Sequence, residues 1–264
     1  MKILIFICLT KGFLSSLSFQ FGISNRPGLG KEAKGGEDAF YANSQLLAVA
    51  DGVGGWNELG IDPAKYSRKL IENVRSLFKK APSEYSKNPR QLLIDAARAN
   101  KEKGSSTLVV GIIDQKSNRL NVANIGDSGY AIFEQTFNGY RMVHRSTEQQ
   151  HSFNFPYQIG SSGDAPESSQ SFSHSIKAGD LIVMGSDGVF DNLHDAMIWM
   201  LVNTGSVSTQ EMADMIVNAA YKLSLDSKYS SPFAVAAKKN GVKFLGGKND
   251  DISVIVAKVI ETNR

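Results

Sequence analysis

Short apolar runs rich in β-branched residues recur along the chain, and each has the length of one strand. They are Leu46–Ala50, Thr107–Ile113, Leu120–Ile125, Tyr130–Phe133, Leu181–Met184 and Ile252–Val259. The second, third and fourth runs follow one another with only short polar segments between them. Because parallel neighbours need a crossover of about a dozen residues or more, this spacing predicts antiparallel pairing.

Helical patterns alternate with these runs, and several open at a recognisable start signal, such as Asp62-Pro63 or the capping box Ser208–Glu211. The predicted helices begin at Asp62-Pro63 and Asn88-Pro89, cover Asp195–Val202 and Met212–Leu225, and run from Ser231-Pro232 to Gly241. The segment Ser161–Ser175 is small, polar and without a period, so we expect a loop or flap there.

The amino terminus carries the apolar segment Ile3–Leu9, which follows a single Lys2 and is too short to span a bilayer. No clear cleavage site follows it, and the segment lacks the arginines of a mitochondrial presequence. We interpret residues 1–16 as a lead-in or targeting segment and residues 17–264 as a single domain. No other stretch of the sequence is apolar enough for a transmembrane helix.

Composition removes several classes of function. The balance of 29 Lys+Arg against 26 Asp+Glu, with no dense basic run, gives no reason to expect a nucleic-acid partner. The chain has one cysteine, Cys8, and four histidines, which excludes an intrachain disulfide and a cysteine-rich zinc site. A metal ion bound here must be held mostly by oxygen, as Mg²⁺, Mn²⁺ and Ca²⁺ are.

Acidic residues gather where the predicted strands begin or end. The four places are Asp51-Gly52, Asp127-Ser128, Asp187-Gly188 (with Asp191 four residues on) and Asp250-Asp251. In an antiparallel sheet, these ends can meet at one rim, where Glu37-Asp38 can join them. Crowded carboxylates repel one another unless a cation neutralises them, and Mg²⁺ or Mn²⁺ suits a site of oxygen ligands. One Asp-Gly pair is commonly only a turn, but this repetition favours a metal site.

Five motifs, taken together, resemble the signature set of the metal-dependent type 2C Ser/Thr protein phosphatases. They are GGEDAF at residues 35–40, DGVGG at 51–55, NIGDSG at 124–129, SDGVFDN at 186–192 and NDDI at 249–252. Their order and spacing agree from about Phe19 to Val259. The stretches VADGVGGW, HRSTEQQH, SPFAVAAKKNG and GGKNDDI resemble a narrower branch of the family, with members in mitochondria and plastids.

The resemblance implies an α+β fold, a four-layer αββα sandwich of two antiparallel sheets flanked by helices, so that residues 17–264 would form one phosphatase catalytic domain. It also implies two Mg²⁺ or Mn²⁺ ions at one end of the sandwich and a weaker third position. Asp51 would bridge both ions, Glu37 and the Gly52 carbonyl would bind one, and Asp187 and Asp250 the other. Asp38 would act through bound water, and Asp127 and Asp191 match the third position.

The mechanism implied by the resemblance is hydrolysis by a water that bridges the two ions, without a covalent phosphoenzyme. Asp51, Asp187 and Asp250 would then be the catalytic residues, acting through that water.

The sequence departs from the family pattern at two positions. Val53 stands where many members have a histidine proposed as the leaving-group acid, and Ala33 stands where many have a phosphate-binding arginine. Lys34, Lys31 or Arg26 could supply the positive charge instead, although a lysine lacks the bidentate geometry of arginine.

The sequence therefore predicts a protein-serine/threonine phosphatase that takes a phosphoprotein substrate and acts as a monomer. Two alternatives remain: a pseudophosphatase that only binds, and a phosphatase of small phosphorylated metabolites. The complete set of acids argues against the first but does not exclude the second. The branch resemblance favours a mitochondrion or another organelle, with the cytoplasm as the alternative.

Three other residues have two interpretations each. His144 and His151 flank a polar loop, where we favour structural hydrogen bonding over substrate recognition. Trp56 follows the glycines of DGVGG, where it can serve in packing or form a wall of a substrate cleft.

Overall fold

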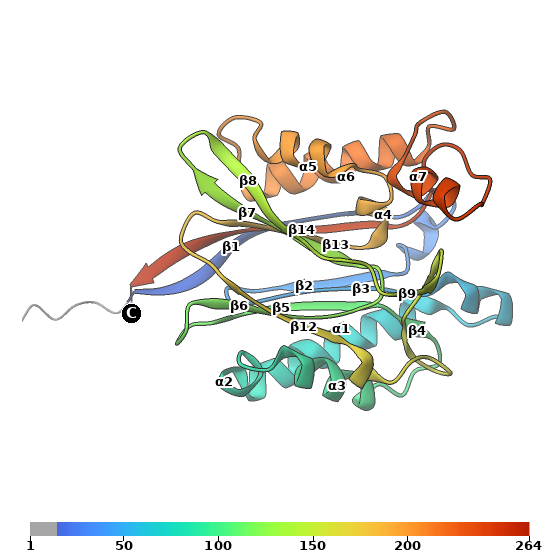
Figure 1. Ribbon diagram of the computed structural model, residues 1–264. Helices are drawn as coiled ribbons and strands as arrows, with labels where there is room; N and C mark the ends of the chain where they lie inside the picture. The colour runs from blue at the N-terminus through green and yellow to red at the C-terminus, as the bar shows by residue number, and fades with distance from the viewer. Residues whose placement is uncertain (1–14, 264) are drawn as a thin grey trace, which may run out of the picture.

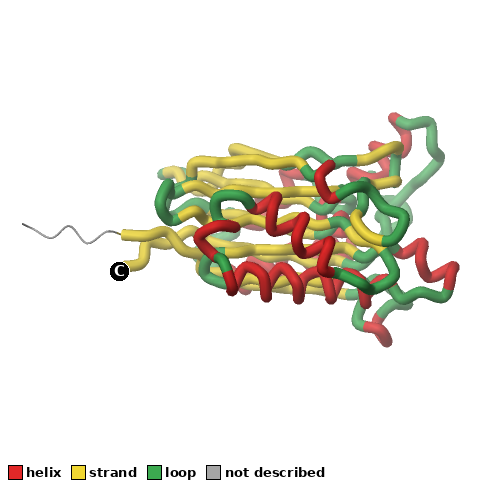
Figure 2. Tube along the Cα trace, turned by 90° about the horizontal axis from the view of Figure 1, so that it is seen from below, coloured by secondary structure: helices red, strands yellow, loops and turns green. Residues whose placement is uncertain are grey.

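Two five-stranded antiparallel sheets lie face to face, and helices cover both outer faces (Figures 1 and 2). This computed structural model describes residues 15–263. The four-layer αββα sandwich predicted from the resemblance is confirmed. Most of the expected lead-in lies outside the described residues, but Ser15 and Ser16 already belong to the first strand.

The first sheet has the strand order β1-β14-β13-β7-β8, and the second has β12-β6-β5-β3-β2. The strands of the first sheet are β1 (Ser15–Arg26), β14 (Ile252–Asn263), β13 (Leu181–Gly185), β7 (Gly129–Thr136) and β8 (Gly139–Arg145). Those of the second are β12 (Gln170–Ser175), β6 (Arg119–Ile125), β5 (Leu108–Asp114), β3 (Leu46–Asp51) and β2 (Asp38–Ala42). Two short pairs lie outside the sheets: β4 (Ser105–Ser106) with β11 (Ile159–Gly160), and β9 (Gln150–Ser152) with β10 (Phe155–Pro156).

The prediction of a loop over Ser161–Ser175 is wrong for its last part, because β12 pairs with β6 along its whole length. This edge strand turns Phe172 toward the space between the sheets, while the residues around it are polar. A strand with one inward apolar side chain gives almost no periodic signal, which explains the error.

The predicted helix starts are confirmed, since Asp62, Asn88, Ser208 and Ser231 each accept a hydrogen bond from a backbone amide of the first turn. Beneath the second sheet in Figure 1 lie α1 (Pro63–Lys80), α2 (Pro82–Tyr85) and α3 (Pro89–Ala99). On the side of the first sheet lie α4 (Asp187–Phe190), α5 (Asp195–Val202), α6 (Thr209–Ser224) and α7 (Pro232–Lys239). The short 3₁₀ helices are η1 (Glu32–Lys34), η2 (Gly54–Leu59) and η3 (Pro166–Ser168).

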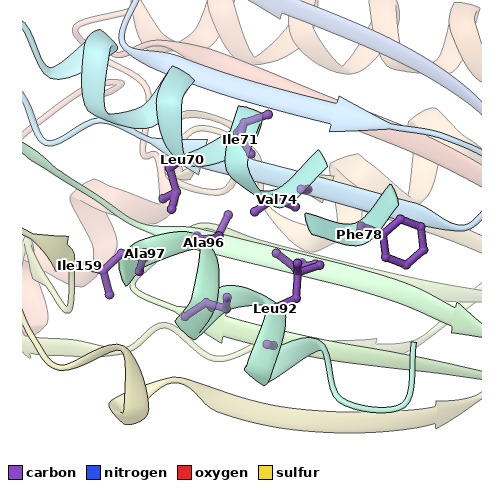
Figure 3. Packing of buried hydrophobic residues seen from close by; sticks show 14 of the residues in the cluster. Leu70, Ile71, Val74, Phe78, Leu92, Ala96, Ala97 and Ile159 are labelled. Carbon is purple, nitrogen blue, oxygen red and sulfur yellow. The ribbon is translucent and has the colours of Figure 1, made fainter. Parts of the chain in front are cut away.

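The buried core has three layers, and β3 contributes to two of them. Leu46 and Ala48 pack against the helices of the second sheet, whereas Leu47 and Val49 face the first sheet. Figure 3 shows the helical layer, in which Leu70, Val74 and Phe78 of α1 meet α3. Because β3 is buried on both faces, it holds Asp51 rigidly at its end. Within residues 15–263, no helix combines the length and apolar character needed to cross a membrane.

Candidate metal centre

Acids from both sheets meet at one end of the sandwich, where β14 begins and β3 ends. Asp38 opens β2 and pairs directly with Asp51 at the end of β3. From the other sheet, Asp187 opens α4 just after β13, and Asp250 lies just before β14. The Ser186 hydroxyl ties the sheets together, since it donates to Asp38 Oδ2 at 2.7 Å. The structure thus places these four acids of the predicted set in one site.

Glu37 is buried in the same site and is held on three sides. Its carboxylate accepts a hydrogen bond from Asn57 Nδ2 at 2.6 Å. Its carbonyl oxygen accepts from the Ser67 hydroxyl at 2.5 Å and from the Gly52 amide at 3.2 Å. Its amide donates to Asp251 Oδ2 at 2.7 Å. Glu37 is therefore preorganised beside Gly52 rather than free to turn toward solvent.

Two lysine ammonium groups lie among the acids. Lys31 Nζ is 2.8 Å from Glu37 Oε2 and 3.1 Å from Asp250 Oδ1. Lys248 Nζ contacts Asp187 Oδ2, lies 2.7 Å from Asp191 Oδ2 and is 3.4 Å from Asp250 Oδ2. Asp250 therefore faces both cations.

Burial, together with the neighbouring charges, shifts the pKa values of this site strongly. Burial, reinforced by the charge of Asp251, raises the pKa of Asp38 to about 8. Burial, reinforced by neighbouring carboxylates, also raises the pKa values of Asp51 and Asp127 well above the ordinary range. Burial alone would lower the pKa of Lys248, but the charges of Asp187 and its neighbours outweigh it and raise that pKa. Without a bound cation, Asp38, Asp51 and Asp127 therefore keep their protons at pH values where an exposed aspartate is already ionised.

The oxygen atoms of these acids are suitable ligands for a hard divalent cation, although their side chains do not converge on one point. Within the described part of the chain, no three acidic or histidine side chains converge as a ready ligand set. The buried oxygens Asp38 Oδ1 and Asp187 Oδ1, however, have no hydrogen-bond partner. Such oxygens, beside carboxylates whose charges repel, are suitable ligands for Mg²⁺ or Mn²⁺. Of the third-position candidates, Asp191 touches Lys248, and Asp127 is buried within reach of the charge of Asp187.

Of the three candidate phosphate-binding residues, Lys31, Lys34 and Arg26, the structure places Lys31 in the site. Lys31 lies in the site, with its side chain 33% exposed. Arg26 does not, because its guanidinium stacks 3.5 Å above the ring of Tyr221 in α6. Lys34 is exposed on η1, where its carbonyl accepts a hydrogen bond from Arg68.

Asp251 was predicted only as part of the acidic pair Asp250-Asp251, and Lys248, Ser186 and Asn57 were not predicted as site residues. Asp251 and Lys248 stand inside the GGKNDDI stretch, but only the fold shows which way each side chain points. Asp251 anchors the Gly28 and Glu37 amides at 2.8 and 2.7 Å, while its neighbour Asp250 faces the lysines.

The histidines lie in different surroundings. His144 belongs to an aromatic cluster with Tyr130, Phe172 and His174, where its ring centroid is 4.4 Å from that of His174. His144 is therefore structural, as favoured, but through ring packing in β8 and not through the predicted hydrogen bonding, since its buried Nε2 has no hydrogen-bond partner within residues 15–263. His151 stacks on Tyr157 at 3.9 Å and contacts Asp164 at 2.9 Å, in a cleft that Trp56 also lines.

Known proteins resemble the chain over nearly its whole length. The family model described as Stage II sporulation protein E (SpoIIE) matches residues 42–260. Protein phosphatase PTC7 homolog from Danio rerio is 38% identical, and the match covers 94% of this chain and 90% of that protein. The human PTC7 homolog is also 38% identical, with 91% and 85% covered.

Among solved structures, the photosystem II phosphatase PBCP superposes with a TM-score of 0.84 at 32% identity, covering 91% of this chain and 98% of that one. The catalytic domain of the serine/threonine phosphatase PstP, solved with two manganese ions, shares the fold with a TM-score of 0.64 at 18% identity, covering 93% and 100%. With the fold and the relatives in agreement, the chain belongs to the type 2C family of protein phosphatases.

Proposed function

We propose that this protein hydrolyses phosphoserine and phosphothreonine in protein substrates, and that its acid cluster binds two Mg²⁺ or Mn²⁺ ions for this purpose. The observation that carries the proposal is the meeting of Asp38 and Asp51 from one sheet with Asp187 and Asp250 from the other, in a site with unpartnered buried oxygens. The names of the relatives agree with a protein substrate.

The roles that the resemblance implies are compatible with where these residues lie. Asp51 feels the charge of Asp38 from its own sheet and of Asp187 and Asp250 from the other, so it would be the ligand shared by the two ions. Glu37 and the Gly52 carbonyl would hold one ion, and Asp187 and Asp250 the other. When bound, the ions would supply the positive charge that lowers the pKa of a nucleophilic water and offsets the charge of the phosphate.

The protein itself orients these groups and meets the substrate. Asn57 and Ser67 fix the Glu37 carboxylate and backbone, so that a ligand does not have to order them. Lys31 is the partly exposed cation of the site, and its ammonium group can donate to a phosphate oxygen in place of Asp250. Because a lysine is a point charge, this contact gives attraction with little directional selectivity.

The test is an activity assay with three substrates side by side: a phosphothreonine peptide, p-nitrophenyl phosphate and a panel of phosphorylated metabolites, each with Mn²⁺, with Mg²⁺ or with EDTA. We expect hydrolysis of the peptide that EDTA abolishes. Turnover of a metabolite alone would overturn the protein-phosphatase proposal, and metal-loaded protein that binds the peptide without hydrolysing it would identify a pseudophosphatase.

A further inference from the structure

A cleft of about 370 Å³ opens beside the metal centre, between η2 and the segment that runs from β9 to Asp164. Its principal lining residues are Val53, Trp56, Leu59, His151, Phe155 and Asp164. Two of the apolar side chains are unusually open to solvent, since Leu59 is 71% exposed and Phe155 is 53% exposed. An apolar surface of this kind next to a reaction site is a candidate binding surface.

The cleft adjoins the metal centre across η2. Val53, which lines the cleft, directly follows Gly52. Asn57 on η2 donates to Glu37 Oε1, and a Cβ built on Gly54 would lie 3.4 Å from Glu37 Oε2. The helix turn that holds Glu37 is therefore the same turn that presents Trp56 and Leu59 to the cleft.

The polar groups around the cleft are satisfied by one another. The Trp56 indole donates to the Ser105 hydroxyl at 2.6 Å, and that hydroxyl donates to Gln158 Oε1 at 2.5 Å. The backbone N–H of Gln158 donates to Asp164 Oδ2 at 2.9 Å, and Asp164 Oδ1 lies 2.9 Å from His151 Nε2. This chain of hydrogen bonds fixes both walls and leaves mainly apolar faces for an incoming group.

We propose that this cleft binds an apolar or aromatic side chain of the phosphoprotein substrate, close in sequence to the phosphorylated residue. The inference rests on the proposed function. The volume is at the lower end of the range for ligand pockets, which suits one or two side chains. If the phosphate is held at ions bound by Glu37 and Asp51, the cleft lies next to it beyond Val53, within reach of the residues that flank the phosphorylated one.

The experiment compares phosphothreonine peptides that differ only in having Phe, Leu or Ser at the positions flanking the phosphothreonine, with p-nitrophenyl phosphate as a substrate that lacks flanking residues. For the wild-type chain we expect a kcat/KM about tenfold higher for the Phe and Leu peptides than for the Ser peptide. The variants Leu59→Ser and Phe155→Ser should lose this preference and keep the turnover of p-nitrophenyl phosphate.

Matched controls are Leu225→Ser and Phe137→Ser, which change exposed side chains that do not line the cleft. They should keep the preference. Equal rates for all peptides, with normal turnover of p-nitrophenyl phosphate, would overturn the cleft inference alone. No turnover of either substrate class would overturn the proposed function instead. A dimer that Leu59→Ser dissociates, seen by analytical ultracentrifugation, would show that a second copy occupies the cleft and would also overturn the inference.

Discussion

Lys248 offsets the charge of three buried acids of the site. Its side chain is only 16% exposed, and its ammonium group faces Asp187, Asp191 and Asp250. A buried carboxylate without a counter-charge is strongly destabilising, so this one lysine supplies charge that a cation would otherwise supply. A divalent ion that uses Asp191 must therefore compete with Lys248.

The variant Lys248→Met keeps most of the side-chain volume and removes the charge. In EDTA we expect it to lower the free energy of unfolding by about 3 kcal/mol, measured by urea denaturation. With saturating Mn²⁺ the loss should shrink, because the ion replaces the missing charge. The control Lys69→Met breaks the exposed pair with Glu72 and should change stability by less than about 1 kcal/mol. Equal losses with and without Mn²⁺ would contradict this role for Lys248.

At the scale of elements, the site depends on how closely backbones approach one another around Gly52. A Cβ at this position would lie 2.8 Å from the Glu37 carbonyl oxygen and 3.0 Å from the Pro63 carbonyl oxygen. Gly52 thus allows β2, the end of β3 and the start of α1 to meet behind Glu37. Any side chain there must push at least one of these three segments away.

We therefore expect Gly52→Ala to destabilise the fold by about 1–3 kcal/mol and to weaken Mn²⁺ binding, because Glu37 moves with its backbone. The control is Gly55→Ala, where a Cβ would meet no atom within 4 Å. Thermal unfolding and Mn²⁺ titration calorimetry measure both effects. If the two alanine variants behave alike, close packing behind Glu37 is not what positions it.

The elements differ in how well the sequence could predict them. The doubly buried β3 is apolar from Leu46 to Ala50, so its pattern was clear. The edge strands β8 and β12 were not predicted, because they are largely polar and are stabilised by pairing with a neighbour. In β12 that pairing includes side-chain hydrogen bonds from Arg119 to Ser173 and Ser175. Because Arg119 lies far away in the sequence, the residues of β12 alone do not predict these bonds.

The candidate site was predictable where its residues follow strand ends, and unpredictable where a long side chain reaches it from another segment. The local sequence shows which acids stand at strand ends, so their meeting at one rim of the sheets could be predicted. The lysines could not be placed, because a long side chain reaches a partner that only the fold brings near. Lys31 and Arg26 illustrate this: Lys31 turns toward Glu37, whereas Arg26 stacks on Tyr221.

Across the whole molecule, charge is separated rather than balanced. The chain has a formal net charge of +3, yet at least seven acids share one end of the sandwich with two lysines. Burial and mutual repulsion raise the pKa of Asp38 to about 8 and, with burial the larger cause, that of Asp191 to about 7. In the unfolded chain these carboxyls titrate near pH 4.

This difference predicts how stability depends on pH. Above about pH 6.5 the unfolded chain has already lost these protons, whereas the folded chain still binds them, so stability must fall as the pH rises toward 8. Burial lowers the pKa of His174 to about 4, which acts in the opposite direction but only below about pH 6.5. In EDTA we expect the Tm to fall between about pH 6.5 and 8, and Mn²⁺ to flatten this slope. A Tm in EDTA that rises over this interval would contradict the assigned shifts.

The central claim is that acids from two sheets form one divalent-cation site, and titration calorimetry with Mn²⁺ tests it most directly. The wild-type chain should bind two ions, and Asp51→Asn should weaken the binding of both, because Asp51 is the ligand that we propose the two ions share. Asp114→Asn, at the end of β5 away from the site, should bind as the wild type does. Absence of Mn²⁺ binding by the wild type, or unchanged binding of both ions by Asp51→Asn, would contradict the account.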